Sequence, residues 1–282
     1  MTRFAYVNGR YLPHDQAQIH IEDRGFQFAD AIYEVWSVRS GDLLDADGHF
    51  GRLERSLAEL RIGNPKTRAG YQLIISELLR RNRVTDGLVY LQISRGRARR
   101  DHAFPAAHTR PTVVMTAKRL DPAAAERRAD HGVGVITRPD QRWARCDIKT
   151  VNLLPNVLAK QAAIEAGAAE AWLVDTAGNV TEGSSTNAWI LNAEGVLVTR
   201  QADHAILHGI TRAMIMNRAA GLGYRVEERA FSVEEAQSAR EAFMTSATTF
   251  VTSITSIDGR PVGNGAPGSV AIALRAAYVG SL

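Results

Sequence analysis

Residues 146–155 of the 282-residue chain run Cys-Asp-Ile-Lys-Thr-Val-Asn-Leu-Leu-Pro and place Lys149 among apolar neighbours. Only four of the 34 basic residues are lysines, so chemistry that needs a lysine has few candidates. Partial burial disfavours the charged ammonium group and so lowers the pKa of a lysine. The neutral amine can then attack a carbonyl, and the usual product is a Schiff base. A structural pairing of Lys149 with Asp147 is the alternative. The remaining lysines are expected to be solvated: Lys66 in a loop, Lys118 at a strand end and Lys160 on an Ala-rich helix.

The composition is that of a globular protein, with 45% hydrophobic and 23% charged residues and enough length for two domains. The single cysteine, Cys146, excludes an internal disulfide framework and a Cys-based zinc finger. We expect it to be a small buried side chain and not a nucleophile. No apolar run approaches the ~20 residues of a membrane helix, and no signal-peptide pattern is found. A cytoplasmic protein without a membrane partner is therefore expected.

A net charge of +4 and a pI of about 9.4 raise the possibility of nucleic-acid binding. The arginines are densest over 80–83 and 95–100, without the interleaved aromatics of a base-stacking surface. So modest an excess of positive charge is more typical of a protein that binds anionic small ligands than of one that binds nucleic acid. No nucleic-acid partner is therefore expected. His204 and His208 have the spacing of helical metal ligands, but Gly209 interrupts the helix there, so no metal site is expected.

Hydrophobic periodicity and turn residues predict an α+β protein. Strands are expected over 4–7, 10–12, 31–38, 42–44, 88–93, 112–116, 134–137, 170–175 and 187–191. Helices are expected from about 50 to 63 and over 69–82, 156–166, 210–221 and 269–279. The polar, alanine-rich residues 119–132 are predicted to be a linker between a domain of residues 1–118 and a larger domain of residues 133–282.

Two further segments carry candidate binding groups. Residues 180–187, Val-Thr-Glu-Gly-Ser-Ser-Thr-Asn, are expected to join two strands as a loop that presents Glu182, although an ordinary polar turn would look similar. Residues 207–212, Leu-His-Gly-Ile-Thr-Arg, open a helix with Gly209 and Thr211, which suits a phosphate, although most helix starts bind only water.

The chain carries six motifs whose identity and order resemble those of the fold-type IV pyridoxal-phosphate enzymes, or class IV aminotransferases, and within them the D-amino-acid transaminases. They are Phe28-Ala-Asp-Ala-Ile-Tyr-Glu-Val, His49-Phe-Gly-Arg-Leu, Arg100-Asp-His-Ala-Phe-Pro, Asp147-Ile-Lys-Thr-Val-Asn-Leu-Leu-Pro-Asn-Val, Thr181-Glu-Gly-Ser-Ser-Thr-Asn and Ile206-Leu-His-Gly-Ile-Thr-Arg. The resemblance covers essentially the whole chain. It implies two α/β domains with pyridoxal 5'-phosphate at their interface, and a homodimer.

The resemblance also implies the site residues. Lys149 would hold the cofactor aldehyde as a Schiff base and move the substrate proton, while Glu182 would keep the pyridine nitrogen protonated. Leu207 would pack against the ring. The phosphate and the adjoining loop would involve Arg52, Ser185, Thr186, Ile210, Thr211 and Thr248.

The substrate class rests on a second group of residues. Arg100 and His102 match an Arg-x-His pair that, with the Tyr33 hydroxyl, binds the substrate carboxylate and selects the D enantiomer in the transaminases that the chain resembles. The resemblance therefore implies exchange between a D-amino acid, such as D-alanine or D-glutamate, and a 2-oxo acid, pyruvate or 2-oxoglutarate.

The chain departs from the family pattern at Gly51, Thr150 and Trp36-Ser37. Because residues after Tyr33 line the substrate pocket in the family, Trp36 is expected to narrow or redirect it. An (R)-amine or branched-chain amino acid transaminase on the same fold remains the nearest alternative. A non-catalytic, basic RNA-binding protein is a further alternative, against which Lys149 and Glu182 argue.

Overall fold

The computed structural model describes residues 3–280, so the outermost residues of the two predicted domains, 1–2 and 281–282, lie outside it. The chain folds into two compact units. The first contains the residues up to Asp121 and takes back a short segment, Ile148–Asn152. The second contains Pro122–Asp147 and the residues from Leu153 onward.

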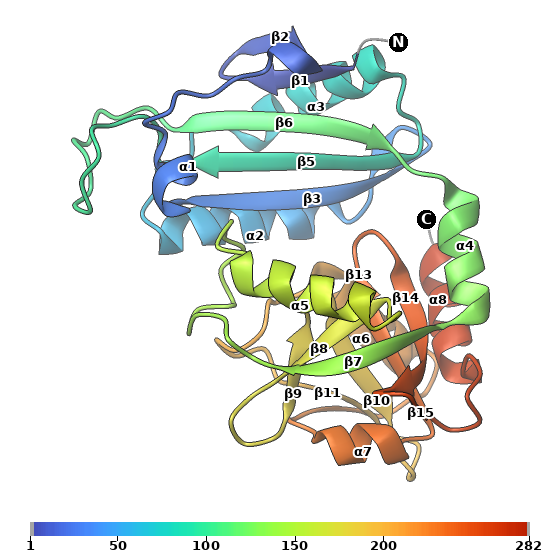
Figure 1. Cartoon of the computed structure of the whole chain (residues 1–282). Coiled ribbons are helices and arrows are strands. Elements are labelled where there is room, and N and C mark those ends of the chain that lie inside the picture. The colour runs from blue at the N-terminus through green and yellow to red at the C-terminus, as the bar shows by residue number, and fades with distance from the viewer. Residues whose placement is uncertain (1–2, 281–282) are drawn as a thin grey trace. The chain divides into compact units, whose positions relative to one another are not determined.

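The first unit is built on a six-stranded antiparallel sheet in the order β2-β1-β6-β5-β3-β4 (Figure 1). Its strands are β1 (Phe4–Val7), β2 (Arg10–Pro13), β3 (Ala31–Arg39), β4 (Asp42–Leu43), β5 (Gly87–Ser94) and β6 (Thr112–Arg119). Its helices are α1 (Arg24–Phe28), α2 (Ala46–Glu59) and α3 (Arg68–Asn82), with a 3-10 turn over His14–Gln16. The β1–β2 turn uses Asn8 and Gly9 at positive φ, as this dipeptide favours in a tight hairpin.

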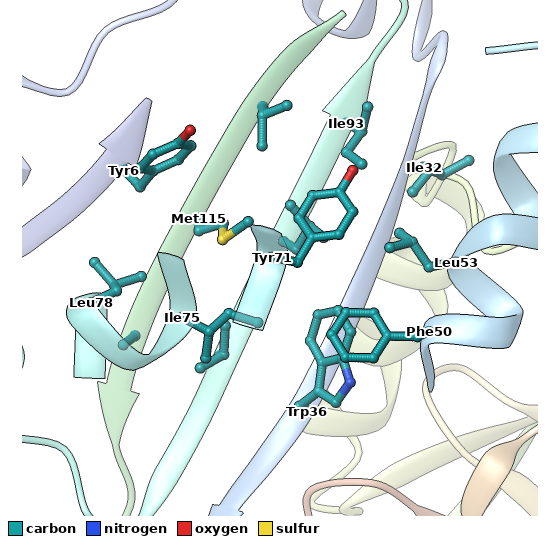
Figure 2. Close-up of a cluster of buried hydrophobic side chains, with 14 of the residues drawn as sticks. Tyr6, Ile32, Trp36, Phe50, Leu53, Tyr71, Ile75, Leu78, Ile93 and Met115 are labelled. Atoms are coloured by element: carbon teal, nitrogen blue, oxygen red, sulfur yellow. The ribbon is translucent and has the colours of Figure 1, made fainter. Parts of the chain in front are cut away.

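One face of this sheet is buried under α2 and α3. Phe50 and Leu53 of α2 and Tyr71 and Ile75 of α3 pack on it around Trp36, as Figure 2 shows. The prediction that Trp36 shapes the substrate pocket is wrong, because its ring is fully buried in this core, with its centroid 5.1 Å from that of Phe50. Successive strand residues point to opposite faces, so Trp36, three residues after Tyr33, lies on the other side of β3.

The second unit contains a nine-stranded sheet, in which β12-β11-β10-β13-β14-β7-β8-β9 are neighbours in that order and β15 pairs with β14 (Figure 1). Its strands are β7 (Val133–Pro139), β8 (Glu170–Val174), β9 (Val180–Gly183), β10 (Asn187–Leu191), β11 (Leu197–Thr199), β12 (Val226–Glu228), β13 (Glu241–Ser246), β14 (Phe250–Ile257) and β15 (Arg260–Pro261). Its helices are α4 (Pro122–His131), α5 (Leu154–Glu165), α6 (Ile210–Gly221), α7 (Val233–Ser238) and α8 (Ser269–Val279).

The predicted α+β class is confirmed, and two segments differ from their predicted local structure. Residues 122–131, expected as part of a linker, form helix α4, because alanine and arginine favour helix and Glu126 pairs with Arg275 of α8 at 3.0 Å. Residues 180–183, expected as part of a loop, form strand β9 beside β8. None of the helices within residues 3–280 has the length and apolar character needed to span a membrane.

Candidate active site

Lys149 lies in the short segment that the first unit takes back. This segment runs beside the start of β3: Tyr33 donates its backbone N–H to the Lys149 carbonyl at 2.9 Å, and Val151 donates to Ala31 at 3.2 Å. Ile148 and Thr150 are buried on either side, while Lys149 is half-buried. The backbone pairing therefore fixes the lysine at the edge of the sheet.

The Lys149 amine lies over the ring of Tyr33, 4.3 Å from the ring centroid. Between residues 3 and 280 it has no hydrogen bond or ion pair, and Asp147, its predicted alternative partner, is bound by Arg145 at 2.9 Å. Tyr33 also stacks on Tyr90, with centroids 5.7 Å apart. Burial, with a contribution from Tyr33, raises the pKa of Tyr90 to about 12, so its hydroxyl stays protonated and adds no charge beside the lysine.

Arg52 belongs to a buried charged cluster around Glu34, on the face of β3 opposite to Tyr33. Its Nη2 donates to Glu34 Oε1 at 2.7 Å and its Nε to Oε2 at 3.0 Å, while His49 Nδ1 lies 2.9 Å from Oε1. Burial alone would raise the pKa of Glu34, but the Arg52 charge and the hydrogen bonds from His49 and Arg52 together outweigh it and hold this pKa well below its usual range. The carboxylate thus stays ionised and fixes the arginine.

Arg100 and His102 lie in the segment that joins β5 to β6, which extends beyond the end of the sheet in Figure 1. Both are exposed and both contact Phe28: the Arg100 guanidinium is 5.2 Å, and the His102 ring 5.4 Å, from its centroid. The structure therefore brings these two residues together. Over the described residues, no hydrogen bond or ring contact joins either of them to Tyr33.

Glu182 lies on β9 in the second unit, and its side chain is 7% exposed. Its two oxygens accept the Leu207 backbone N–H at 3.1 Å, and Oε2 accepts from Asn187 Nδ2 at 2.9 Å. Arg142 Nη1 also donates to Oε1. A carboxylate with this many donors is held in its ionised form and in one orientation.

Ile210 and Thr211 form the first turn of α6, after Gly209. Thr211 is buried, and its hydroxyl has no hydrogen-bond partner within the described part of the chain. A Cβ on Gly209 would lie 2.0 Å from Asn187 Oδ1, so only glycine allows the amide that holds Glu182 to approach this turn. The unpaired backbone N–H groups of a first turn attract an anion.

The remaining predicted residues lie in two turns of the second unit. The Thr186 hydroxyl is buried and, like that of Thr211, has no partner among residues 3–280, whereas Ser185 is exposed and donates to Glu170 at 2.8 Å. Thr248 lies in the turn between β13 and β14, with its hydroxyl 3.4 Å from that of Ser246.

Sequence reasoning missed the side chains that hold the predicted ones. Asn187 and Glu34 stand in quoted motifs and could have been found there, but Arg142 and Asp140 carry no local signal of a role. Cys146 is half-buried, whereas a buried side chain is expected from the sequence. Desolvation raises the pKa of its thiol to about 12, so the thiol is not a nucleophile at neutral pH. No cluster of metal ligands occurs among the described residues.

A half-buried lysine on an aromatic ring and an ionised carboxylate beside a helix start are groups that an enzyme uses on a carbonyl cofactor. Residues 31–257 match the family model for amino-transferase class IV, and the chain belongs to that family. The predicted enzyme class is thereby confirmed.

Curated relatives and solved structures agree with this assignment. A D-alanine aminotransferase from Bacillus licheniformis is 41% identical over 93% of this chain and 90% of its own length. One from Staphylococcus haemolyticus is 35% identical over 96% of this chain and 94% of its own. A branched-chain amino acid aminotransferase from T.th., solved with pyridoxamine 5'-phosphate, is 26% identical, with a TM-score of 0.89 over 99% of this chain and 93% of that one.

The residues present fit pyridoxal phosphate, the cofactor of class IV aminotransferases. The buried Thr211 hydroxyl lacks a partner within the described residues and lies at a helix start, where a phosphate would accept from it. Glu182 offers an anionic acceptor to a protonated pyridine nitrogen, and the Lys149 amine is available to an aldehyde.

Proposed function

We propose that this protein is a pyridoxal-phosphate-dependent D-amino-acid transaminase that exchanges amino groups between a D-amino acid and a 2-oxo acid. The observation that carries the proposal is the Lys149 amine on the Tyr33 ring, in a chain similar to D-alanine aminotransferases. When bound, the cofactor supplies an electron sink that makes the substrate Cα–H acidic.

The first unit supplies the base. Lys149 would hold the cofactor aldehyde through its Nζ, and the same amine would serve as the base that takes up the substrate Cα proton and gives it back. One group thus anchors the cofactor and transfers the proton. Tyr33, packed between Lys149 and Tyr90, orients this amine and offers its hydroxyl to the substrate.

The second unit supplies most of the cofactor-binding groups. Glu182 would accept the pyridine N–H, and Leu207, whose backbone N–H donates to Glu182, would pack against the ring. Ile210 and Thr211 would donate to the phosphate, Thr248, Ser185 and Thr186 would line it, and Arg52, which Glu34 holds in place, would contribute a further donor.

Arg100→Ala is expected to raise the KM for D-alanine roughly 10-fold or more, because a charge-assisted hydrogen bond to the substrate carboxylate is lost. We propose Arg100 and His102 as the carboxylate-binding pair. An (R)-amine without a carboxylate serves as the comparison, since its KM should change little. Arg99→Ala, a neighbouring exposed arginine, is the matched control. Equal increases for both substrates would remove the assignment.

A panel of amino donors tests the proposed function: D-alanine, L-leucine and (R)-phenylethylamine, each with pyruvate or 2-oxoglutarate. The D-alanine arm should be the fastest. Preference for L-leucine or for (R)-phenylethylamine would favour the branched-chain or amine alternative instead. A protein that takes up no pyridoxal phosphate would overturn all three, and RNA retention by it would favour the non-catalytic alternative.

We also propose a homodimer in the cytoplasm. Among the described residues, four large apolar side chains are exposed on helix α5, Leu154, Val157, Leu158 and Ile164. The first unit exposes a further five, Ile19, Ile21, Phe26, Leu73 and Phe104. Exposed apolar groups gathered on one helix are typical of an interface. Light scattering should give about twice the chain mass of 30.8 kDa, and a monomer at micromolar concentration would contradict this.

A further inference from the structure

Arg142 connects two carboxylates in the second unit. Its Nε and Nη2 donate to Asp140 Oδ1 and Oδ2 at 2.9 and 2.7 Å, in the two-pronged geometry that suits guanidinium and carboxylate. Its Nη1 donates to Glu182 Oε1. Nη2 also donates to the Ala205 carbonyl at 3.0 Å. The guanidinium is therefore held at a fixed position between the two acids.

The whole cluster is buried, since the side chains of Arg142, Asp140 and Glu182 are 6, 10 and 7% exposed. Thr181 donates its hydroxyl to Asp140 Oδ2 at 2.7 Å. Burial alone would raise the pKa of Asp140, but hydrogen bonds and charge from Arg142 outweigh it and lower that pKa. Asp140 is thus ionised, and the three groups together carry one net negative charge.

This charge balance decides what Glu182 can do. If Arg142 faced Glu182 alone, its positive charge would cancel that of the carboxylate, and little would remain to hold a proton on a nearby pyridine nitrogen. Asp140 takes up the charge of Arg142 instead. If Arg142 were absent, two buried carboxylates would remain and one would take up a proton.

We propose that Asp140 and Arg142 are positioning residues that act as one unit: Arg142 orients the Glu182 carboxylate, and Asp140 neutralises Arg142 so that Glu182 presents a net negative charge to the cofactor. The inference rests on the proposed function. The inference extends the proposed function by assigning a role to two residues that are not expected to touch cofactor or substrate.

A double-mutant cycle tests the proposal, with the dissociation constant of pyridoxal phosphate as the first readout and the kcat and KM for D-alanine as the second. Asp140→Asn keeps the shape and the Thr181 contact but removes the charge. We expect it to weaken cofactor binding roughly 10-fold and to lower kcat with a smaller change in KM. Arg142→Met should weaken binding by at least as much.

The combined Asp140→Asn, Arg142→Met variant gives the decisive result. It leaves Glu182 alone with its charge, so we expect it to bind the cofactor no more weakly than the Arg142→Met variant, and the two effects should not multiply. Effects that multiply would mean independent structural roles and would overturn the proposal. The matched controls are Asp175→Asn and Arg200→Met, which break another ion pair of the same unit, with Arg200 Nη1 2.8 Å from Asp175 Oδ2. Both should leave cofactor affinity unchanged.

Two further outcomes are separable. Asp140→Asn is nearly isosteric, so if Arg142→Met fails to fold, an unchanged cofactor affinity and kcat in a folded Asp140→Asn protein still overturns the proposal. If the unmodified protein binds pyridoxal phosphate and uses D-alanine, that result leaves the proposed function standing. If the unmodified protein binds no pyridoxal phosphate, both fail together.

Discussion

Lys149→Ala is expected to lower turnover of D-alanine by about 10⁴-fold or more, because it removes both the covalent anchor of the cofactor and the base that moves the proton. We expect the unmodified protein to be yellow with bound pyridoxal phosphate and the variant to be colourless. The Lys149 amine contacts the Tyr33 ring and has no ion pair within the described residues, so its loss leaves no buried partner charge behind. The melting temperature of the cofactor-free protein should therefore change little.

The measurement combines visible absorption with borohydride reduction and peptide mapping. Reduction should fix the cofactor to Lys149 in the unmodified protein and to no residue in the variant. Lys118→Ala, an exposed lysine of the same unit, is the matched control and should retain colour and activity. Recovery of the cofactor on another lysine of the unmodified protein would contradict the assignment.

Glu182→Gln is expected to leave the cofactor attached to Lys149 but to lower kcat roughly 100-fold or more. The amide keeps the size of the carboxylate and loses the charge that stabilises a protonated pyridine nitrogen as electrons move into the ring. Glu182→Lys should have a larger effect, because it places two cations, Arg142 and the new lysine, together.

The corresponding control is Glu194→Gln, at an exposed position of the same unit. Borohydride reduction separates the two roles in the site, since it should still label Lys149 in the Glu182→Gln protein. A variant with normal kcat would remove Glu182 from the proton-holding role, whereas a variant that no longer binds cofactor would show that Glu182 is mainly an anchor.

Much of the fold could be predicted from the sequence where one local pattern dominates. The Asn8-Gly9 hairpin and helix α6 have clear turn and helix-start residues, and the structure has both. Helix α4 has no apolar periodicity in its alanine-rich, charged sequence, and its ion pair is with Arg275, distant in sequence. The family pattern predicts Trp36 in the substrate pocket, whereas strand alternation places it on the face opposite Tyr33, in the core.

The residues of the site likewise fall into those that local sequence marks and those that it does not. Lys149 and Glu182 are marked by their flanking residues and by the motifs that contain them. The partners that hold Glu182 and Arg52 come close only through folding: Arg142 lies forty positions before Glu182, and Glu34 lies eighteen before Arg52. Helical or strand periodicity does not relate such partners. Strand pairing and the path of the loops bring them together, so no sequence spacing identifies them.

The chain passes from the second unit to the first and back within five residues, Ile148–Asn152. No single cut can therefore separate the protein into two self-sufficient pieces. A fragment that ends at Asp121 would contain all six strands of its sheet yet lack the segment beside β3 that carries the lysine. Fragment complementation or gene splitting at that boundary should give two polypeptides that become competent only when the second donates this segment to the first.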